Sequence, residues 1–133
     1  MTPAAGAVIL VDTSVWIAHL RSSDPTLVHL LDRGLVVSHP FVVGELALGT
    51  LRQREAVLDA LLGLPRAAVA TDGEVLHFIA RHALAGRGVG YVDIHLLASV
   101  RLTAGTTLWT SDKHLHAITA ELALAFTQSQ QSI

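Results

Sequence analysis

The chain has 133 residues and no cysteine, so a domain of this size can form a core without disulfides, and thiolate metal ligands are excluded. Its net charge is -2 and only 15% of its residues are charged, which argues weakly against a polyanionic partner. No apolar run reaches the roughly 20 residues of a membrane helix, and no basic residue precedes the first apolar run. We therefore expect a cytoplasmic protein without a membrane anchor or secretory signal.

The first half of the chain alternates short apolar runs with helical patterns. A short continuous apolar run is typical of a parallel strand buried on both faces, and a Ser-Asp-Pro sequence followed by glycine is typical of a capped helix and its end. The expected elements are, in chain order, a strand at 8–11, a helix at 12–20, a helix at 23–33, a strand at 35–38, and helices at 40–51 and 54–62.

The second half continues the alternation. Its expected elements are a weak strand at 67–70, a helix at 72–84, a glycine-rich loop at 85–90, a helix at 91–102, a strand at 106–110, a short helix at 112–118 and a strand at 122–126. Because parallel neighbours need crossover connections, this order predicts an α/β domain with a mainly parallel sheet of four or five strands. One domain is expected over 1–133, with flexible ends at 1–6 and 128–133.

Two aspartates follow predicted strands, and a third opens a predicted helix. Asp12 comes after the first strand and Asp112 after the strand at 106–110, while Asp93 lies in the first turn of an apolar helix. Taken singly, each is explained at least as well as a helix cap. Taken together they indicate a site, because parallel sheets bind ligands beyond the carboxyl ends of their strands.

Glu45 is the fourth acidic candidate. It is the only charged residue in the segment 41–49, whose other members are almost all apolar. Burying a lone carboxylate there would be costly, and no basic residue lies three or four positions away to pair with it. We therefore expect a distant partner or a cation.

Four carboxylates at one cleft would suit a hard divalent cation such as Mg²⁺ or Mn²⁺. Their mutual repulsion would raise some of their pKa values until a cation bound. Without these four residues the chain has nine basic and seven acidic residues, a net charge of +2, so a nucleic-acid partner is not excluded.

Four segments resemble the ordered motifs of the PIN-domain nucleases, and among these the VapC-type toxins of bacterial toxin–antitoxin pairs. The segments are Val11–Ile17, Gly44–Leu46, Asp93–Ala98 and Thr110–Asp112. The resemblance spans nearly the whole chain. It implies a three-layer α/β/α domain, Mg²⁺- or Mn²⁺-dependent RNA cleavage, and neutralisation by a small antitoxin.

Carried over by position, the resemblance makes Asp12, Glu45, Asp93 and Asp112 the acidic quartet. It makes Ser14 and Thr110 hydroxyl residues that support the quartet. The chain departs from the pattern at two histidines: His114 stands where many members have a further acid, and His95 stands where small or apolar residues are usual. By the same resemblance, a structured tRNA loop is the first choice of substrate and ribosomal RNA the second.

Four basic residues are candidates for RNA phosphate contacts, each with the alternative of being an ordinary surface charge. They are Arg52, Arg54, Arg87 and Lys113. The low charge content and the resemblance both favour a homodimer, with contacts near Trp16 or the segment Arg54–Leu62, although Trp16 is also a candidate for the core.

Other functions fit the sequence less well. A metal-free ribonuclease could use His114 with His116, or His77 with His82, but neither spacing places two rings squarely on one helix face. An aspartate-nucleophile phosphatase would need an aspartate where Ser14 stands. A DNA nuclease and a non-catalytic binding module remain open alternatives. EDTA-sensitive activity would separate catalysis from binding alone.

Overall fold

The computed structural model describes residues 7–128, so the predicted flexible ends at 1–6 and 128–133 lie outside this range except for residue 128. Its elements are, in chain order, β1 (Ile9–Val11), α1 (Thr13–Arg21), α2 (Pro25–Asp32), β2 (Val36–Val37), α3 (Pro40–Leu48), α4 (Arg54–Leu62), α5 (Asp72–Arg81), α6 (Tyr91–Arg101), β3 (Thr107–Trp109) and α7 (Lys113–Glu121). No helix within the described range is long and apolar enough to cross a membrane.

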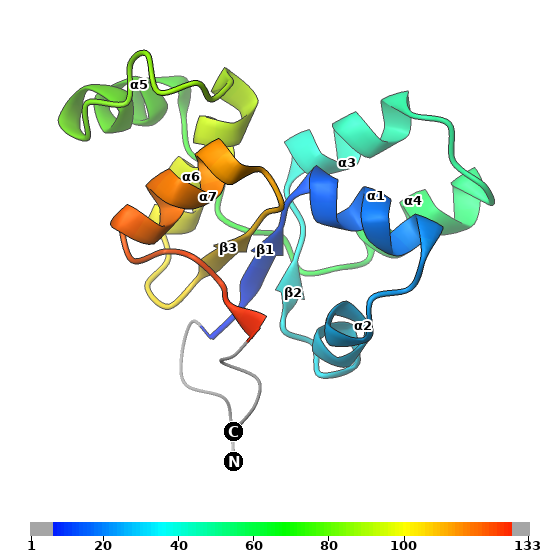
Figure 1. Ribbon diagram of the computed structural model, residues 1–133. Helices are drawn as coiled ribbons and strands as arrows, with labels where there is room; N and C mark the ends of the chain where they lie inside the picture. Colours follow the sequence, from blue (N-terminus) through cyan, green and yellow to red (C-terminus); the bar gives the residue numbers. More distant parts are fainter. Residues whose placement is uncertain (1–6, 129–133) are drawn as a thin grey trace.

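The sheet has three parallel strands in the order β2-β1-β3. Helices α1 to α4 lie on one side of it and α5 to α7 on the other, which gives the three α/β/α layers (Figure 1). Leu10 on the central strand pairs with Val37 on one side and Leu108 on the other. The predicted α/β class and the parallel strand direction are confirmed.

The prediction of four or five strands was wrong for the described residues. A single bridge joins Ser38 to Arg66, just before the segment expected as a strand at 67–70, and the segment at 122–126 contributes a single bridge between Leu108 and Ala125. The first cannot extend, because β2 is only two residues long and the Ala70 N–H donates to the Ser99 side chain instead of to a strand. The apolar composition of the segment did not show that its backbone would bond to α6 instead of to the sheet.

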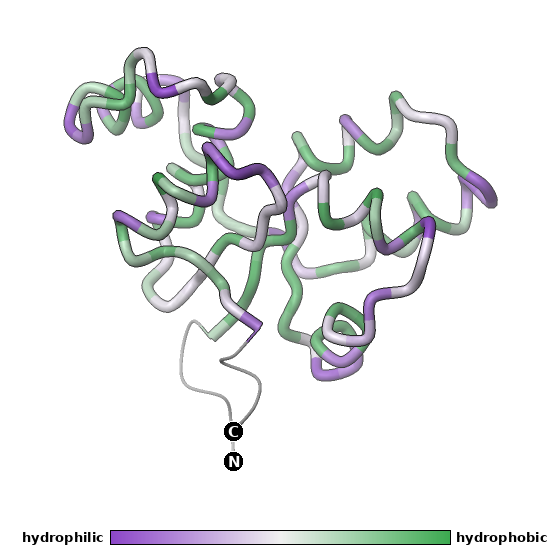
Figure 2. The backbone as a smooth tube through the Cα atoms, in the orientation of Figure 1, coloured by the Kyte–Doolittle hydropathy of each residue, from purple (hydrophilic) through white to green (hydrophobic). Residues whose placement is uncertain are grey.

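The core lies on both faces of the sheet. Leu10 and Leu108 are fully buried, as are Leu96 and Leu97 of α6, the helix whose residues from Ile94 to Val100 are all buried. Figure 2 shows the apolar residues gathered along the central strands and the polar residues at helix ends and in connecting loops. Burying each such leucine stabilises the fold by about 2 kcal/mol.

Strands β1 and β3 end at the same edge of the sheet. Their last residues, Val11 and Trp109, are paired, and the Asp12 N–H donates to the Trp109 carbonyl at 2.9 Å. Because both strands run in the same direction, the residues that follow them leave the sheet side by side. The aspartates after the two strands therefore start from neighbouring backbone positions.

Candidate active site

Asp12 is held by two hydroxyl groups at the carboxyl edge of the sheet. Its side chain is 4% exposed, and its Oδ2 accepts hydrogen bonds from Ser14 Oγ and Thr110 Oγ1, both at 2.8 Å. No residue between 7 and 128 donates to Oδ1. Asp12 occupies the N-cap position of α1, yet its side chain makes no capping hydrogen bond. The capping explanation of this aspartate is therefore wrong.

The same two hydroxyl groups connect β1 to the loop after β3. Ser14 Oγ accepts from the Ser111 N–H, and Thr110 Oγ1 accepts from the Asp112 N–H, both at 3.1 Å. Both hydroxyls donate to Asp12. Ser14 also accepts a backbone N–H from the loop after β3, and Thr110 accepts one from its own loop. The arrangement fixes the first and last aspartates relative to one another.

Asp112 serves as a helix cap, as the alternative explanation of this residue predicted. Its Oδ1 accepts the Leu115 N–H at 2.9 Å and so begins α7. The residue is exposed, and none of the described residues donates to its Oδ2. Capping fixes the side chain while one oxygen stays free of hydrogen bonds from residues 7–128.

Glu45 lies on the outer face of α3, which corrects the expectation that it is surrounded by apolar side chains. Val42 and Leu46 face the core at 1% and 2% exposed, whereas Glu45 is exposed and Leu48, three residues further on, is 91% exposed. The outer face of α3 is itself apolar, so the composition of the segment did not show which face of the helix is buried. Thr13 Oγ1 donates to Glu45 Oε1 at 2.7 Å and holds it against the start of α1.

Sequence reasoning did not single out Thr13. It stands between Asp12 and Ser14 in the same Asp-Thr-Ser motif, and successive residues of a helix start point in different directions. The signal that could have found it was this position, since a hydroxyl between two site residues can reach a third.

The negative charges of the other three carboxylates act on the pKa of Asp93. It is partly buried at the start of α6, and its pKa is raised to about 6 by desolvation and then by the negative charges of Asp12, Asp112 and Glu45, against a smaller opposing effect of a backbone hydrogen bond at Gly90. Charges act on one another in this way only when they lie near each other. The fold therefore brings the four predicted acids to one edge of the sheet.

The donor chemistry fits a hard divalent cation. All four side chains offer carboxylate oxygens, and Mg²⁺ is commonly held by one or two carboxylates while keeping several waters. Among the described residues no three acidic or histidine side chains stand close enough to surround one ion. A site with few direct protein ligands and several waters matches this spacing better than a closed cage does.

The basic candidates divide into two groups. The Arg54 guanidinium donates to the Ala47 and Gly49 carbonyls at the end of α3, and Arg87 forms an ion pair with Glu121. Both therefore have structural partners. Arg52 and Lys113 are exposed and form no hydrogen bond or ion pair with any residue between 7 and 128.

The two histidine departures have packing roles. His95 is 2% exposed and lies against the rings of Phe41, His39 and Tyr91, with centroids 4.3, 5.5 and 5.9 Å away. Its Nδ1 is buried without a hydrogen-bond partner among the described residues. His114 is exposed on α7 and lies beside the glycine-rich loop at Gly88.

The contact between Gly88 and His114 gives a testable prediction about the loop. Gly88 has φ +80°, and an added Cβ would lie 3.3 Å from the His114 ring, whereas Gly86 has φ +77° and open space around it. Gly86→Ala should cost about 1 kcal/mol of unfolding free energy through backbone strain alone. Gly88→Ala should cost more, and urea unfolding of both variants measures the difference. Equal losses would show that the loop does not pack on α7.

The α/β/α layers and the four acids at the sheet edge define a class of protein, and a family model that matches most of the chain identifies that class. The family model described as "PIN domain" matches residues 9–121, and the chain belongs to the PIN-domain family. Ribonuclease VapC32 of Mycobacterium tuberculosis, in strains CDC 1551 / Oshkosh and ATCC 25618 / H37Rv, is 51% identical over 120 residues, which cover 90% of this chain and 97% of the relative. The predicted resemblance to VapC-type proteins is confirmed.

Proposed function

We propose that this protein is a Mg²⁺-dependent endoribonuclease of the VapC type, with Mn²⁺ able to substitute, and that it inhibits translation by cutting structured RNA. The observation that carries the proposal is the convergence of four carboxylates at one edge of the sheet, where desolvation and then the charges of the other three raise the pKa of Asp93. Carboxylates that lie near one another repel, and a bound cation would offset that repulsion. The name of the mycobacterial relative, a ribonuclease, supports RNA as the substrate.

In this proposal Asp12, Glu45, Asp93 and Asp112 would hold the cation, with waters between it and the carboxylates that do not reach it directly. When bound, it would supply a water of lowered pKa and neutralise charge on the scissile phosphate. Attack of hydroxide on the phosphorus, with the P–O bond to the 3′ oxygen breaking and that oxygen taking up a proton, would give 5′-phosphate and 3′-hydroxyl ends.

The chain's own side chains orient these acids. Ser14 and Thr110 donate to Asp12 Oδ2, which leaves Oδ1 as the oxygen offered to a cation, and Thr13 orients Glu45 in the same manner. Asp93, with a pKa of about 6, carries a proton part of the time near neutral pH. It would release that proton when a cation occupies the site.

A transfer RNA loop is the proposed substrate and ribosomal RNA the second choice. A small VapB-type antitoxin is the proposed inhibitor, and the proposed location is the cytoplasm. A homodimer is also proposed, but not through Trp16, which is only 7% exposed. Leu48 at 91% and Leu62 at 67% exposed are the apolar side chains that a partner would most readily cover.

Cleavage assays test the proposal directly. The purified protein should cut tRNA at a defined position in Mg²⁺ or Mn²⁺, lose activity in EDTA and regain it when Mn²⁺ is added. Mapping the 5′ ends of the fragments identifies the site. Hydrolysis of small phosphoesters with RNA left intact would instead support a phosphatase, and cleavage unaffected by EDTA would contradict the role of the carboxylates.

A further inference from the structure

A cleft opens beside Glu45, between the end of α1 and the turn that joins α3 to α4. Its volume is about 640 Å³, within the range of roughly 300–1,000 Å³ typical of ligand sites. Its lining includes Ile17, Leu20, Arg21, Glu45, Leu51 and Arg52. Because Glu45 belongs both to this cleft and to the acidic edge, the two sites adjoin.

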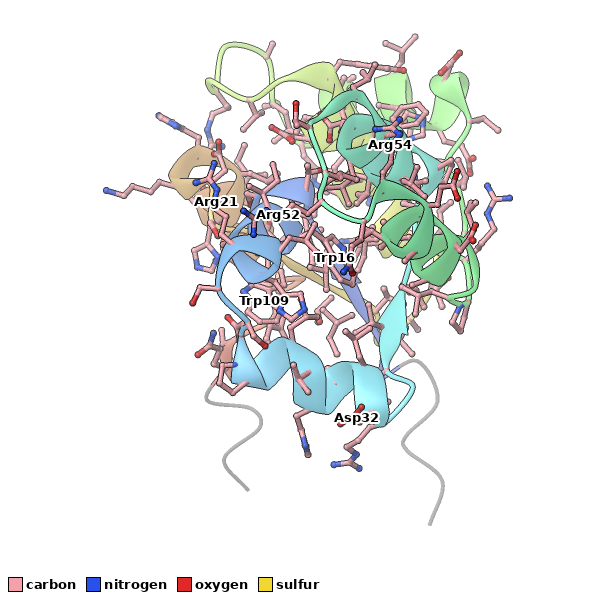
Figure 3. All side chains as sticks on the ribbon, turned by 90° about the vertical axis from the view of Figure 1, so that its right-hand side faces the viewer. Trp16, Arg21, Asp32, Arg52, Arg54 and Trp109 are labelled. Atoms are coloured by element: carbon pink, nitrogen blue, oxygen red, sulfur yellow. The ribbon has the colours of Figure 1, made fainter. Side chains whose placement is uncertain are left out.

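Two arginines give the cleft a positive charge. Arg21 ends α1 and Arg52 lies before α4, and Figure 3 shows the two side chains close together on the same side of the molecule. Neither guanidinium forms a hydrogen bond or ion pair with a residue between 7 and 128. Arg54 shows the contrast, since its guanidinium is engaged by the carbonyls at the end of α3.

The remaining wall of the cleft is apolar. Ile17 and Leu20, one helical turn apart on α1, are each 41% exposed, and Leu51, in the turn after α3, also lines the cleft. Guanidinium groups bind phosphate oxygens through paired hydrogen bonds, and aliphatic surface accepts the flat face of an unstacked base. The combination suits a nucleotide better than it suits an apolar peptide, which would leave both arginines without a partner.

We propose that this cleft binds the single-stranded RNA segment next to the scissile phosphate. Arg21 and Arg52 hold its phosphates, and Ile17 and Leu20 support an unstacked base. The inference rests on the proposed ribonuclease function and adds a requirement to it. The segment beside the cut must be unpaired, because a base stacked in a duplex cannot reach the aliphatic wall.

A binding experiment tests this separately from cleavage. In the Asp12→Asn background, which prevents turnover, the double change Arg21→Gln with Arg52→Gln should weaken binding of a fluorescent single-stranded RNA oligonucleotide about tenfold. Two lost phosphate contacts should also lower the slope of log K against log salt by about 1.4. The same sequence annealed into a duplex should bind more weakly than the single strand.

The matched control removes two arginines elsewhere. Arg81 and Arg101 line a second groove between α5 and α6 and also lack partners among the described residues. Arg81→Gln with Arg101→Gln has the same effect on net charge and should change affinity less than twofold.

Equal weakening of RNA binding by both pairs of substitutions would overturn the proposal. No weakening by the cleft pair would also overturn it, and that second result would favour a protein partner in the cleft. RNA binding at the cleft without metal-dependent cleavage would instead contradict the proposed function alone.

Discussion

The Asp12→Asn variant is expected to cut RNA about 10³-fold more slowly than the wild type while keeping its fold, a loss of about 4 kcal/mol in transition-state stabilisation. Asp12 is the most deeply buried of the four acids, and its Oδ1 is the oxygen offered to the cation. An amide in its place can still accept both hydroxyl hydrogen bonds through its oxygen. It would then present an NH₂ group, which cannot bind a cation, where Oδ1 stood.

The control for this variant is Asp32→Asn. Asp32 is an exposed acid on α2, far from the labelled arginines of the cleft in Figure 3, and it carries the same change of charge. Initial cleavage rates on one tRNA substrate and thermal unfolding curves should be measured for both variants. Unchanged cleavage by Asp12→Asn would remove Asp12 from the mechanism. Loss of activity in both variants would point to net charge and not to the site.

The positions of Asp12 and Asp112 could be predicted because strand direction determines them. A continuous apolar run identified β1 and β3, and parallel strands must end at one edge, so the residues after them had to be neighbours. Glu45 lies near enough to act on Asp93, but the reason for selecting it was mistaken. Its supposed burial was inferred from apolar neighbours, while the structure places it on an exposed face and holds it through Thr13.

Side-chain partners across long sequence distances could not be predicted. Arg54 reaches the Ala47 and Gly49 carbonyls, and Arg87 reaches Glu121, because a long flexible side chain can satisfy whichever acceptor the fold brings near. The predicted number of strands was wrong for a similar reason. Whether a short apolar segment extends a ladder depends on where its neighbours end, and β2 ends after Val37.

Asp93→Asn is expected to stabilise the cation-free protein by about 2 kcal/mol at pH 7 and by nothing near pH 3.5. The pKa of Asp93 is about 6 in the folded protein against 3.8 for an ordinary aspartate. That difference corresponds to about 3 kcal/mol, reduced here to about 2 because the partly exposed group is screened by solvent.

The sign follows from proton binding. Between pH 3.8 and about 6 the folded state holds a proton on Asp93 that the unfolded state has lost, so the free energy of unfolding falls as pH rises through this window. Below it both states are protonated, and above it the full penalty of a charged Asp93 applies. Asparagine has no such penalty at any pH, so the variant gains over the wild type only where Asp93 would be ionised.

Urea unfolding in EDTA at several pH values measures this difference, with Asp32→Asn as the control that should show no comparable gain. Added Mg²⁺ should then reverse the order at pH 7, because the cation stabilises the wild type by binding the folded state and has one ligand fewer in the variant. If Asp93→Asn is no more stable than the wild type at pH 7 in EDTA, neither desolvation nor the neighbouring carboxylates penalise an ionised Asp93 in solution. The electrostatic reason for a cation at this edge would then be lost, even if the protein cleaves RNA.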